Sequence, residues 1–483
     1  MSVVTPVPRR TVQTTTMPTT FARRPDLLPH TVTRLLTAGA TDNVVKLLQK
    51  QHPVEIASIL RRLPDRHRRP TFDLLLAHNQ ALAMQGLAEL SSKLAASLLE
   101  DRAADDVARL LETLPPDDAA PILKRLSDEL STHVRDRMSR GGGADRLLQH
   151  ADRTAGRIMN PDVFALPETT TAGEAVAELQ HSAAQQAEMV FYLYVVDRDG
   201  HLIGVTSLRR LLLVPPETPL HHIMATDVVR IAEDDDQQEA ARLVASYNLL
   251  AVPVVDGHNK LVGTITVDDV IDVIDDETTK DIQKLGGLEA LDEPYTQTPF
   301  ATLVKKRARW LVVLFLGEML TATAMAHYED EIARAVVLAL FVPLIISSGG
   351  NSGSQAASLM IRALAVGELT IRDWWRVMHR EVLSGLALGG ILGAIGFTRV
   401  AVWGHVFDAY GEHSLLVALT VGLSLVGVVL WGTLSGSMLP FIMKRFGADP
   451  ATSSAPFVAT LVDVTGLVIY FTVAAVILRG TLL

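Results

Sequence analysis

Two polar features lie inside apolar segments that are long enough to cross a membrane. The first is a cluster of small and amide residues within the segment 343–364, consisting of Gly349, Gly350, Asn351, Gly353, Ser354 and Gln355. Such residues loosen a helix and expose backbone carbonyl groups. This is tolerated at membrane depth only where the segment is buried in protein or lines a wet cavity. We therefore expect a broken helix here, with free carbonyl oxygens.

The second feature is Asp463, which lies in the apolar segment 456–478. A carboxylate at that depth costs several kcal/mol, so its presence indicates a functional site. Carbonyl, amide and carboxylate oxygens together form a hard-oxygen environment. This environment suits a hydrated divalent cation such as Mg2+.

Five apolar segments must position these residues, and each is near or above the roughly 20 residues that a membrane span needs. They lie at about 309–327, 335–361, 382–403, 414–441 and 456–478. Residues 1–304 carry a net charge of −12, whereas the remainder carries +2. An anionic surface disfavours nucleic acid and attracts cations. The absence of cysteine excludes disulfides and thiolate metal sites.

The basic residues of the short loops predict the orientation. They lie before the first span, between the second and third, and after the fourth: Lys305, Lys306, Arg307, Arg309, Arg362, Arg372, Arg376, Arg380, Lys444 and Arg445. The loops on the opposite side carry almost only Arg334. We therefore expect a multi-pass protein of the cell membrane, with its N-terminus in the cytoplasm and its C-terminus outside.

The N-terminal part is expected to be helical after a disordered tail. Residues 1–25 carry charges but no apolar core, so we expect no signal peptide here. Residues 26–150 have apolar positions at helical spacing, with Pro and Gly between the segments. Segments 53–64 and 104–115 align at an offset of 51 residues. This repeat predicts a small superhelical domain.

A clearer repeat occupies residues 156–276. The sequence YVVDRDGHLIGVTSLRRLL matches PVVDGHNKLVGTITVDDVI at an offset of 59 residues. Each copy predicts a helix, a short apolar strand, a tight turn, a strand and then a helix. The pattern resembles the CBS domain, with copies at 156–218 and 219–276.

The CBS resemblance implies that Ser/Thr-x-x-Asp at the last helix start can bind the ribose of an adenine nucleotide. Thr266 and Asp269 match in the second copy, whereas Arg210 replaces the acid after Ser207 in the first. A guanidinium only donates hydrogen bonds. We therefore expect weak or no ATP binding at the first copy.

Six carboxylates then fall within ten residues, at Asp268, Asp269, Asp272, Asp275, Asp276 and Glu277. A charge run is usually a solvated helix face. A cluster this dense repels itself without counter-ions, so a cation-sensing surface is the functional alternative. A connecting helix over 277–304 follows.

The order of these parts, with PLIISSGGNSGSQAASLMIRALAVGEL and PFVATLVDVTGLVIYF, resembles the MgtE family of magnesium channels and transporters. The resemblance implies a multidomain fold: an α-helical superhelical N-terminal domain, an α/β CBS pair, a connecting (plug) helix and a pore domain of five helices at 305–483. It also implies a homodimer with the pore between the two membrane domains, gated by cytosolic Mg2+.

The same resemblance implies two sets of Mg2+-binding residues. The pore set is Asp463, Ser347, Gly350, Ser354 and Asp449, and the regulatory set is Asp101, Asp105, Asp236, Asp269, Asp272, Glu277 and Asp281. Acids that can occur in the family are replaced by Asn248, Gln238 and Lys280. Fewer or weaker regulatory ions are therefore expected.

The function expected is Mg2+ uptake rather than enzyme catalysis, with Mg2+ as the bound and transported ion. Glu318 is the other membrane carboxylate, and it could line the pore, pair with a base or lie at a dimer contact. Three alternatives remain open. They are a transporter preferring Co2+ or another divalent ion, a non-transporting nucleotide sensor, and an intramembrane aspartyl protease using Glu318 with Asp463.

Overall fold

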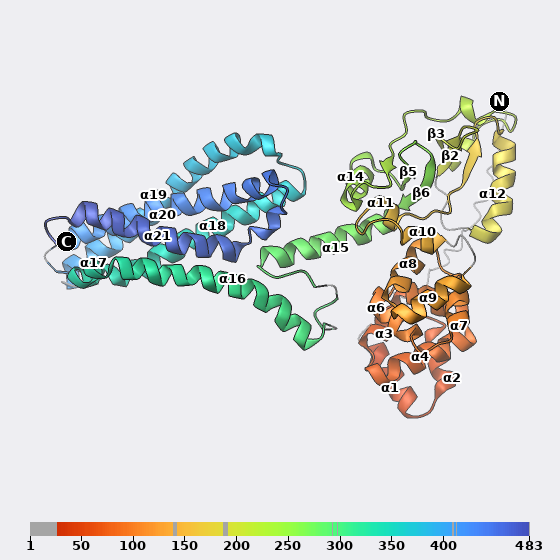
Figure 1. Ribbon diagram of the computed structural model, residues 1–483, viewed down its shortest axis with the longest axis horizontal. Helices are drawn as coiled ribbons and strands as arrows, with labels where there is room; N and C mark the ends of the chain where they lie inside the picture. The colour runs from red at the N-terminus through yellow and green to blue at the C-terminus, as the bar shows by residue number, and fades with distance from the viewer. Residues whose placement is uncertain are drawn as a thin grey trace, which may run out of the picture. The chain divides into compact units, whose positions relative to one another are not determined.

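The computed structural model forms two compact units, Met1–Val273 and Ile274–Leu483 (Figure 1). The division falls within one helix, α15 (Val267–Leu285). The structure describes residues 27–138, 143–186, 192–291, 293–296, 298–407, 410–411 and 413–482. The predicted tail at 1–25 and residues 139–142 lie outside the described residues.

The first unit begins with a run of short helices. They are α1 (Leu27–Thr37), α2 (Thr41–Leu48), α3 (Pro53–Arg62), α4 (Asp65–His78), α5 (Gln80–Ala88), α6 (Ser92–Leu99), α7 (Ala104–Leu111), α8 (Pro116–Arg125), α9 (Asp128–Arg137) and α10 (Gly143–Leu147). The two repeat segments form α3 and α7, whose apolar faces enter one core. Proline at the first turn of α3 and of α8 favours helix initiation there.

The second repeat forms two sheets of identical topology. Its elements are α11 (Ala155–Ile158), β1 (Ala165–Pro167), α12 (Ala172–Gln186), β2 (Tyr192–Val196), β3 (Leu202–Ser207), α13 (Leu208–Leu211), η2 (Leu220–His222), β4 (Ile231–Ala232), α14 (Gln237–Tyr247), β5 (Ala251–Val255) and β6 (Leu261–Thr266). In each sheet the middle strand pairs parallel to the first and antiparallel to the third. The bulges at Val195/Val196 and Val254/Val255 are also 59 residues apart.

The hairpin turns of the two sheets explain why the repeat includes an aspartate. Asp197 Oδ1 accepts hydrogen bonds from the backbone N–H groups of Asp199 and His201, both at 2.9 Å. Asp256 Oδ1 accepts equivalent bonds from His258 and Lys260 at 2.8 Å. The aspartate therefore satisfies the donors of the turn that joins the two antiparallel strands.

The second unit contains, among its described residues, five helical segments long and apolar enough to cross a membrane. Its elements are α16 (Phe300–His327), α17 (Glu329–Arg334), η3 (Val336–Phe341), α18 (Val342–Ala365), η4 (Ile371–Asp373), α19 (Trp374–Phe407), α20 (Ser414–Arg445), η5 (Pro450–Thr452) and α21 (Ala455–Leu478). Within this unit α18 packs against α20 and α21, while α16 lies along α21 (Figure 1). The predicted fold class is confirmed, but the connecting helix expected over 277–304 is wrong in its bounds, because the helix is α15, which ends at Leu285 before the turn at Gly286 and Gly287.

The predicted break in the second span is wrong, because α18 is a continuous helix from Val342 to Ala365. Its glycines serve close packing instead. A Cβ at Gly432 would collide with the carbonyl oxygen of Gly349, and one at Gly436 with that of Gly353. Without a hydrophobic driving force in lipid, helices associate through such small residues. The glycines of α18 and α20 therefore bring two backbones into contact.

Gly436→Ala should destabilise the second unit, because its methyl group would meet the Gly353 carbonyl, which cannot rotate away. We expect a loss of ~1–3 kcal/mol in the free energy of unfolding. This would appear as a lower melting temperature of the detergent-solubilised protein.

Gly390→Ala is the matched control, since a Cβ at Gly390 on α19 would meet nothing within 4 Å. It should be neutral or slightly stabilising, because alanine has the higher helix propensity. Equal losses in the two variants would contradict this account of α18–α20 packing.

Candidate functional site

One face of α18 carries three of the predicted pore residues toward α21. Ser347, Gly350 and Ser354 are spaced by three and four positions, so they lie along the same side of the helix. Ser354 Oγ donates to the carbonyl oxygen of Ala455 at 3.1 Å. Gly350 lies beside Ala459 and Asp463. The two helices therefore run antiparallel, and their contact leads directly to Asp463.

Asp463 is half-buried on α21, next to a glycine that leaves room beside its carboxylate. A Cβ at Gly350 would lie 3.7 Å from Asp463 Oδ1, which is ordinary contact. The preceding residue, Val462, is buried and packs closely on Gly349. This packing fixes the turn of α21 that carries the carboxylate.

Glu318 of α16 lies within hydrogen-bond reach of Asp463. The structure therefore brings together the two carboxylates that the sequence places in different spans. In the described part of the chain no ion pair joins Glu318 to a base. Arg399 stacks instead on the Trp403 ring, 3.5 Å from its centroid.

A polar stripe on α18 remains exposed in the single chain. Ser347, Asn351 and Gln355 recur every four residues and are all exposed. Asn351 Nδ2 lies 3.5 Å from Ser347 Oγ, which is a weak contact. Because the carbonyls of Ser347 and Gly350 belong to a continuous helix, the side-chain oxygens are the better cation ligands here.

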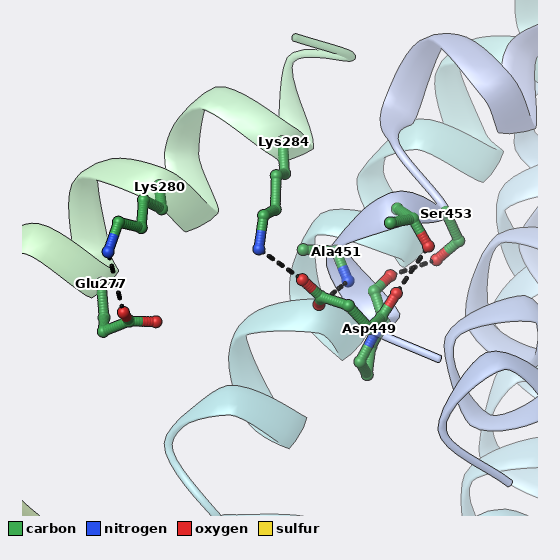
Figure 2. A network of polar contacts seen from close by, with 8 residues as sticks. Glu277, Lys280, Lys284, Asp449, Ala451 and Ser453 are labelled. Carbon is green, nitrogen blue, oxygen red and sulfur yellow. Dashed lines mark hydrogen bonds and ion pairs between the residues drawn. The ribbon is translucent and has the colours of Figure 1, made fainter. Parts of the chain in front are cut away.

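Asp449 lies between α20 and α21, directly before η5, and both of its carboxylate oxygens accept hydrogen bonds. Oδ1 accepts the backbone N–H of Ala451 at 2.9 Å, and Oδ2 accepts Lys284 Nζ at 2.5 Å (Figure 2). Lys284 belongs to α15, so the ion pair links the end of that helix to the connection between α20 and α21. Asp449 thus holds a helix, and its expected contact with ions stays a prediction.

Further contacts hold the end of α15 and the residues that follow it against α16 and α21. Leu285 packs against the core of the second unit, and Glu289 pairs with Arg309 at 2.9 Å. Trp310 donates from Nε1 to Ser454 Oγ at 3.2 Å. A Cβ at Gly287 would lie 2.8 Å from the Trp310 ring, so only glycine permits this approach. The chain after α15 is therefore docked at the start of α16 and α21.

Two of the predicted regulatory acids, Glu277 and Asp281, lie in the part of α15 that belongs to the second unit. Glu277 is buried and accepts a hydrogen bond from Lys280 Nζ at 3.1 Å (Figure 2). Asp276 lies 3.9 Å from the same ammonium group. A lysine of the helix itself thus neutralises part of the acidic cluster.

Asp236, Asp269 and Asp272 belong to the first unit. Asp236 caps α14 by accepting the backbone N–H of Gln238 at 2.8 Å. Asp269 accepts both the hydroxyl of Thr266, at 2.7 Å, and its backbone N–H, at 3.1 Å. Burial, together with the charges of Asp268 and Asp272, raises the pKa of Asp269 to about 6.

The predicted helical-domain pair already has counter-charges. Asp101 is ion-paired with Arg69, and Asp105 with Arg137. In the first CBS copy, Ser207 Oγ accepts the backbone N–H of Arg210 at 3.2 Å, which caps α13. The metal-binding role of the aspartates and the weak ATP binding both stay predictions.

Sequence reasoning missed the Lys284–Asp449 pair and the Trp310–Ser454 contact. Their partners are far apart in the chain, and no local pattern joins them. The sequence Asp449-Pro450 is the one local pattern here, because aspartate before proline is typical of the start of a helix. That pattern predicts the cap of η5 but not its lysine partner.

Comparison with known proteins gives matches over most of the chain. A family model described as MgtE, divalent cation transporter, matches residues 342–473. The CBS domain model matches 155–217 and 220–276, and the model of the MgtE intracellular N domain matches 51–143. The predicted resemblance is confirmed.

Two curated relatives carry the name magnesium transporter MgtE. The protein from Thermus thermophilus is 43% identical over 336 residues, covering 70% of this chain and 72% of the relative. The protein from Bacillus subtilis is 29% identical over 458 residues, covering 92% and 96%. A solved structure described as the cytosolic domain of the Mg2+ channel MgtE in complex with ATP is 33% identical. It covers 51% of this chain and 99% of that chain, with a TM-score of 0.47.

The raised pKa of Asp269 predicts a pH dependence of stability. Between about pH 4 and pH 6 the folded protein keeps a proton that the unfolded chain has lost, so the free energy of unfolding falls as the pH rises. The loss is complete above pH 6 and amounts to about 3 kcal/mol at most. Asp269→Asn should therefore be more stable than the wild type at pH 7.5, because its amide oxygen still accepts from Thr266.

Denaturant unfolding of a fragment of residues 26–300, in chelator at pH 5 and pH 7.5, measures this effect. Asp234→Asn is the control, since Asp234 is exposed and is not among the charges that raise the pKa of Asp269. An Asp269→Asn fragment that retains the wild-type pH dependence would show that another group carries it.

Proposed function

Because this chain belongs to the MgtE family of divalent cation transporters, we propose that it carries Mg2+ across a membrane through its second unit. The observation that supports this path is the juxtaposition of Asp463 with the polar face of α18. Ser347, Asn351 and Gln355 are exposed on a helix that is otherwise apolar enough to lie in lipid. Polar side chains in that position favour a water-filled path over a lipid contact.

The chemistry of the path suits a hydrated divalent ion. Mg2+ dehydrates reluctantly and prefers octahedral oxygen ligands, so it usually keeps several of its waters. The carboxylate of Asp463 can accept hydrogen bonds from those waters, and Gly350 leaves space for them beside Oδ1. Binding through water is strong enough to select the ion and weak enough to release it. Carboxylate and hydroxyl groups therefore fit Mg2+ as the transported substrate.

A second copy of the chain completes the path in this proposal. The stripe on α18 is exposed in one chain, so a single membrane unit leaves it open on one side. A two-fold axis beside this face would place two copies of Asp463 around one ion. Exposed apolar side chains of α16, including Phe315 and Leu316, offer further area for lipid or for the partner.

The orientation of the path follows from the basic loops. Arg362 and Arg372 flank the connection from α18 to α19, and Lys444 lies at the end of α20. These positions are at the same end of the bundle as Asp449, because each lies where an odd-numbered span begins or an even-numbered one ends. By the positive-inside rule this end faces the cytoplasm of a cell membrane. Uptake would then run toward the end where α15 is docked.

Gating would be exerted by α15, which is held at that end. Lys284 binds Asp449, and the residues after the helix pack on Trp310. The acids of α15 repel one another, and Mg2+ bound among them would favour the docked arrangement. The transporter would then close when cytosolic Mg2+ is plentiful. ATP at the second CBS copy, where Thr266 and Asp269 lie together, would act on the same helix.

Asp463→Asn tests the path, because it keeps the size of the side chain and removes the charge that attracts the cation. We expect Mg2+ flux to fall to background in proteoliposomes containing the full-length protein and an Mg2+ indicator. Asp330→Asn on the exposed helix α17 should retain wild-type flux.

Growth rescue of a bacterium that lacks Mg2+ transport gives the same comparison in cells. A folded Asp463→Asn protein with wild-type flux would remove this residue from the ion path. Flux of Co2+ or Mn2+ in preference to Mg2+ would show that the substrate is a different divalent ion.

Lys284→Gln tests the gate, because it removes the charge that holds α15 to Asp449. We expect flux to persist at millimolar Mg2+ on the cytoplasmic side, where the wild type closes. Lys284→Arg should retain closure, since it keeps the positive charge.

The double variant Lys284→Gln/Asp449→Asn should be no more open than Lys284→Gln alone, because the two residues act through one contact. Asparagine at 449 can still accept the backbone N–H of Ala451, so η5 keeps its cap. Additive effects of the two substitutions would mean that Asp449 affects flux independently of Lys284.

A further inference from the structure

Glu318 lies on a helix whose neighbouring surface is apolar and exposed. Leu316, Met319 and Leu320 surround it in the sequence, and all are exposed in the single chain. A carboxylate among such residues is costly in a membrane unless it faces a partner or water. We therefore expect Glu318 to face a protein partner or water rather than lipid.

Three successive contacts fix the face of α16 on which Glu318 lies. Trp310 donates to Ser454 Oγ at 3.2 Å near the start of both helices. About two turns further along α16, a Cβ at Gly317 would lie 2.9 Å from Thr460 Cγ2. Residue numbers rise together in the two helices, so α16 and α21 run parallel. Glu318 follows Gly317 directly and meets Asp463.

This register places Glu318 beside Asp463 of the same chain. The described ion pairs join it to no basic side chain, and its contact with Asp463 lies within one chain rather than requiring a dimer. Two facing carboxylates in an apolar span repel each other, and a cation beside both of them relieves the repulsion. Gly350 on the third helix leaves space beside the same carboxylate.

We propose that Glu318 is a second carboxylate of the cation site at Asp463 and sets its preference for divalent over monovalent ions. The inference rests on the proposed function of Asp463 as an ion ligand. The attraction between an ion and a site grows with the product of their charges. A second carboxylate therefore adds twice as much attraction for Mg2+ as for K+ or Na+.

Hydration makes the arrangement workable. Mg2+ keeps its inner waters, so each carboxylate needs only to accept hydrogen bonds from them. One carboxylate comes from α16 and the other from α21, and because they lie close together both can accept hydrogen bonds from waters on the same side of the ion. With both charges present the ion enters at lower concentration, and the site distinguishes it by charge rather than by close fit.

Glu318→Gln in the full-length protein tests the proposal, since it is isosteric and keeps hydrogen bonding. In proteoliposomes the half-saturating Mg2+ concentration should rise about tenfold, and the ratio of Mg2+ to K+ flux should fall. Glu318→Asp keeps the charge and should show a smaller rise. Glu381→Gln, on a half-buried glutamate of α19 away from Asp463, should behave as the wild type.

The outcomes separate this inference from the proposed function. If Asp463→Asn abolishes flux while Glu318→Gln retains wild-type half-saturation and selectivity, only the role of Glu318 is overturned. If Asp463→Asn itself transports normally, the proposed ion path fails first. A change in half-saturation without any change in the Mg2+ to K+ ratio would overturn the claim about selectivity.

Discussion

The backbone contact between α18 and α20 is the constraint on which the candidate site depends. Gly349 and Gly353 lie against Gly432 and Gly436, at positions where a methyl group on either α20 glycine would strike a carbonyl oxygen. Because one face of α18 is fixed so tightly, its opposite polar face has a single position relative to α21. Asp463 therefore meets Gly350 through packing that involves no polar bond to the carboxylate. The position of Asp463 is thus set by glycines that lie away from its carboxylate.

The carboxylates within the spans and those near α15 differ in whether they have a basic partner. At the membrane site, Asp463 and Glu318 face each other, and the described ion pairs give neither of them a basic partner. At the end where α15 docks, Asp449 has Lys284, and Glu277 has Lys280. A carboxylate that has its own ammonium group is a poor place for an exchanging ion. One that faces another carboxylate is stabilised by a cation or by a shared proton. Aspartate thus holds α15 through Asp449, whereas Asp463 binds the cation in the proposed function.

The parts that could be predicted from sequence are those with a local pattern. The five spans follow from length and apolarity, and the CBS pair from a repeat that reproduces even the strand bulge. The helix break at Gly349–Gly353 was predicted wrongly, because glycine that permits close packing has the same sequence pattern as glycine that loosens a helix. Lys284–Asp449 could not be predicted, since its partners lie in elements that only the tertiary fold brings together. Glu318 was visible as an anomaly, and its pairing with Asp463 was considered only as part of the protease alternative.

In the proposed gating, the contacts of α15 would reduce the number of ions that its acidic cluster binds. Lys280 already neutralises Glu277 and lies near Asp276, while burial favours the protonated form of Asp269. The exposed carboxylates of the first half of the helix, such as Asp268 and Asp275, lie outside these contacts. Ion binding would therefore act mainly on the first half of α15, whereas lysines hold the second half without metal. In the proposed gating, a helix that is anchored at one end and charge-sensitive at the other could respond to Mg2+ while its anchored end remains docked.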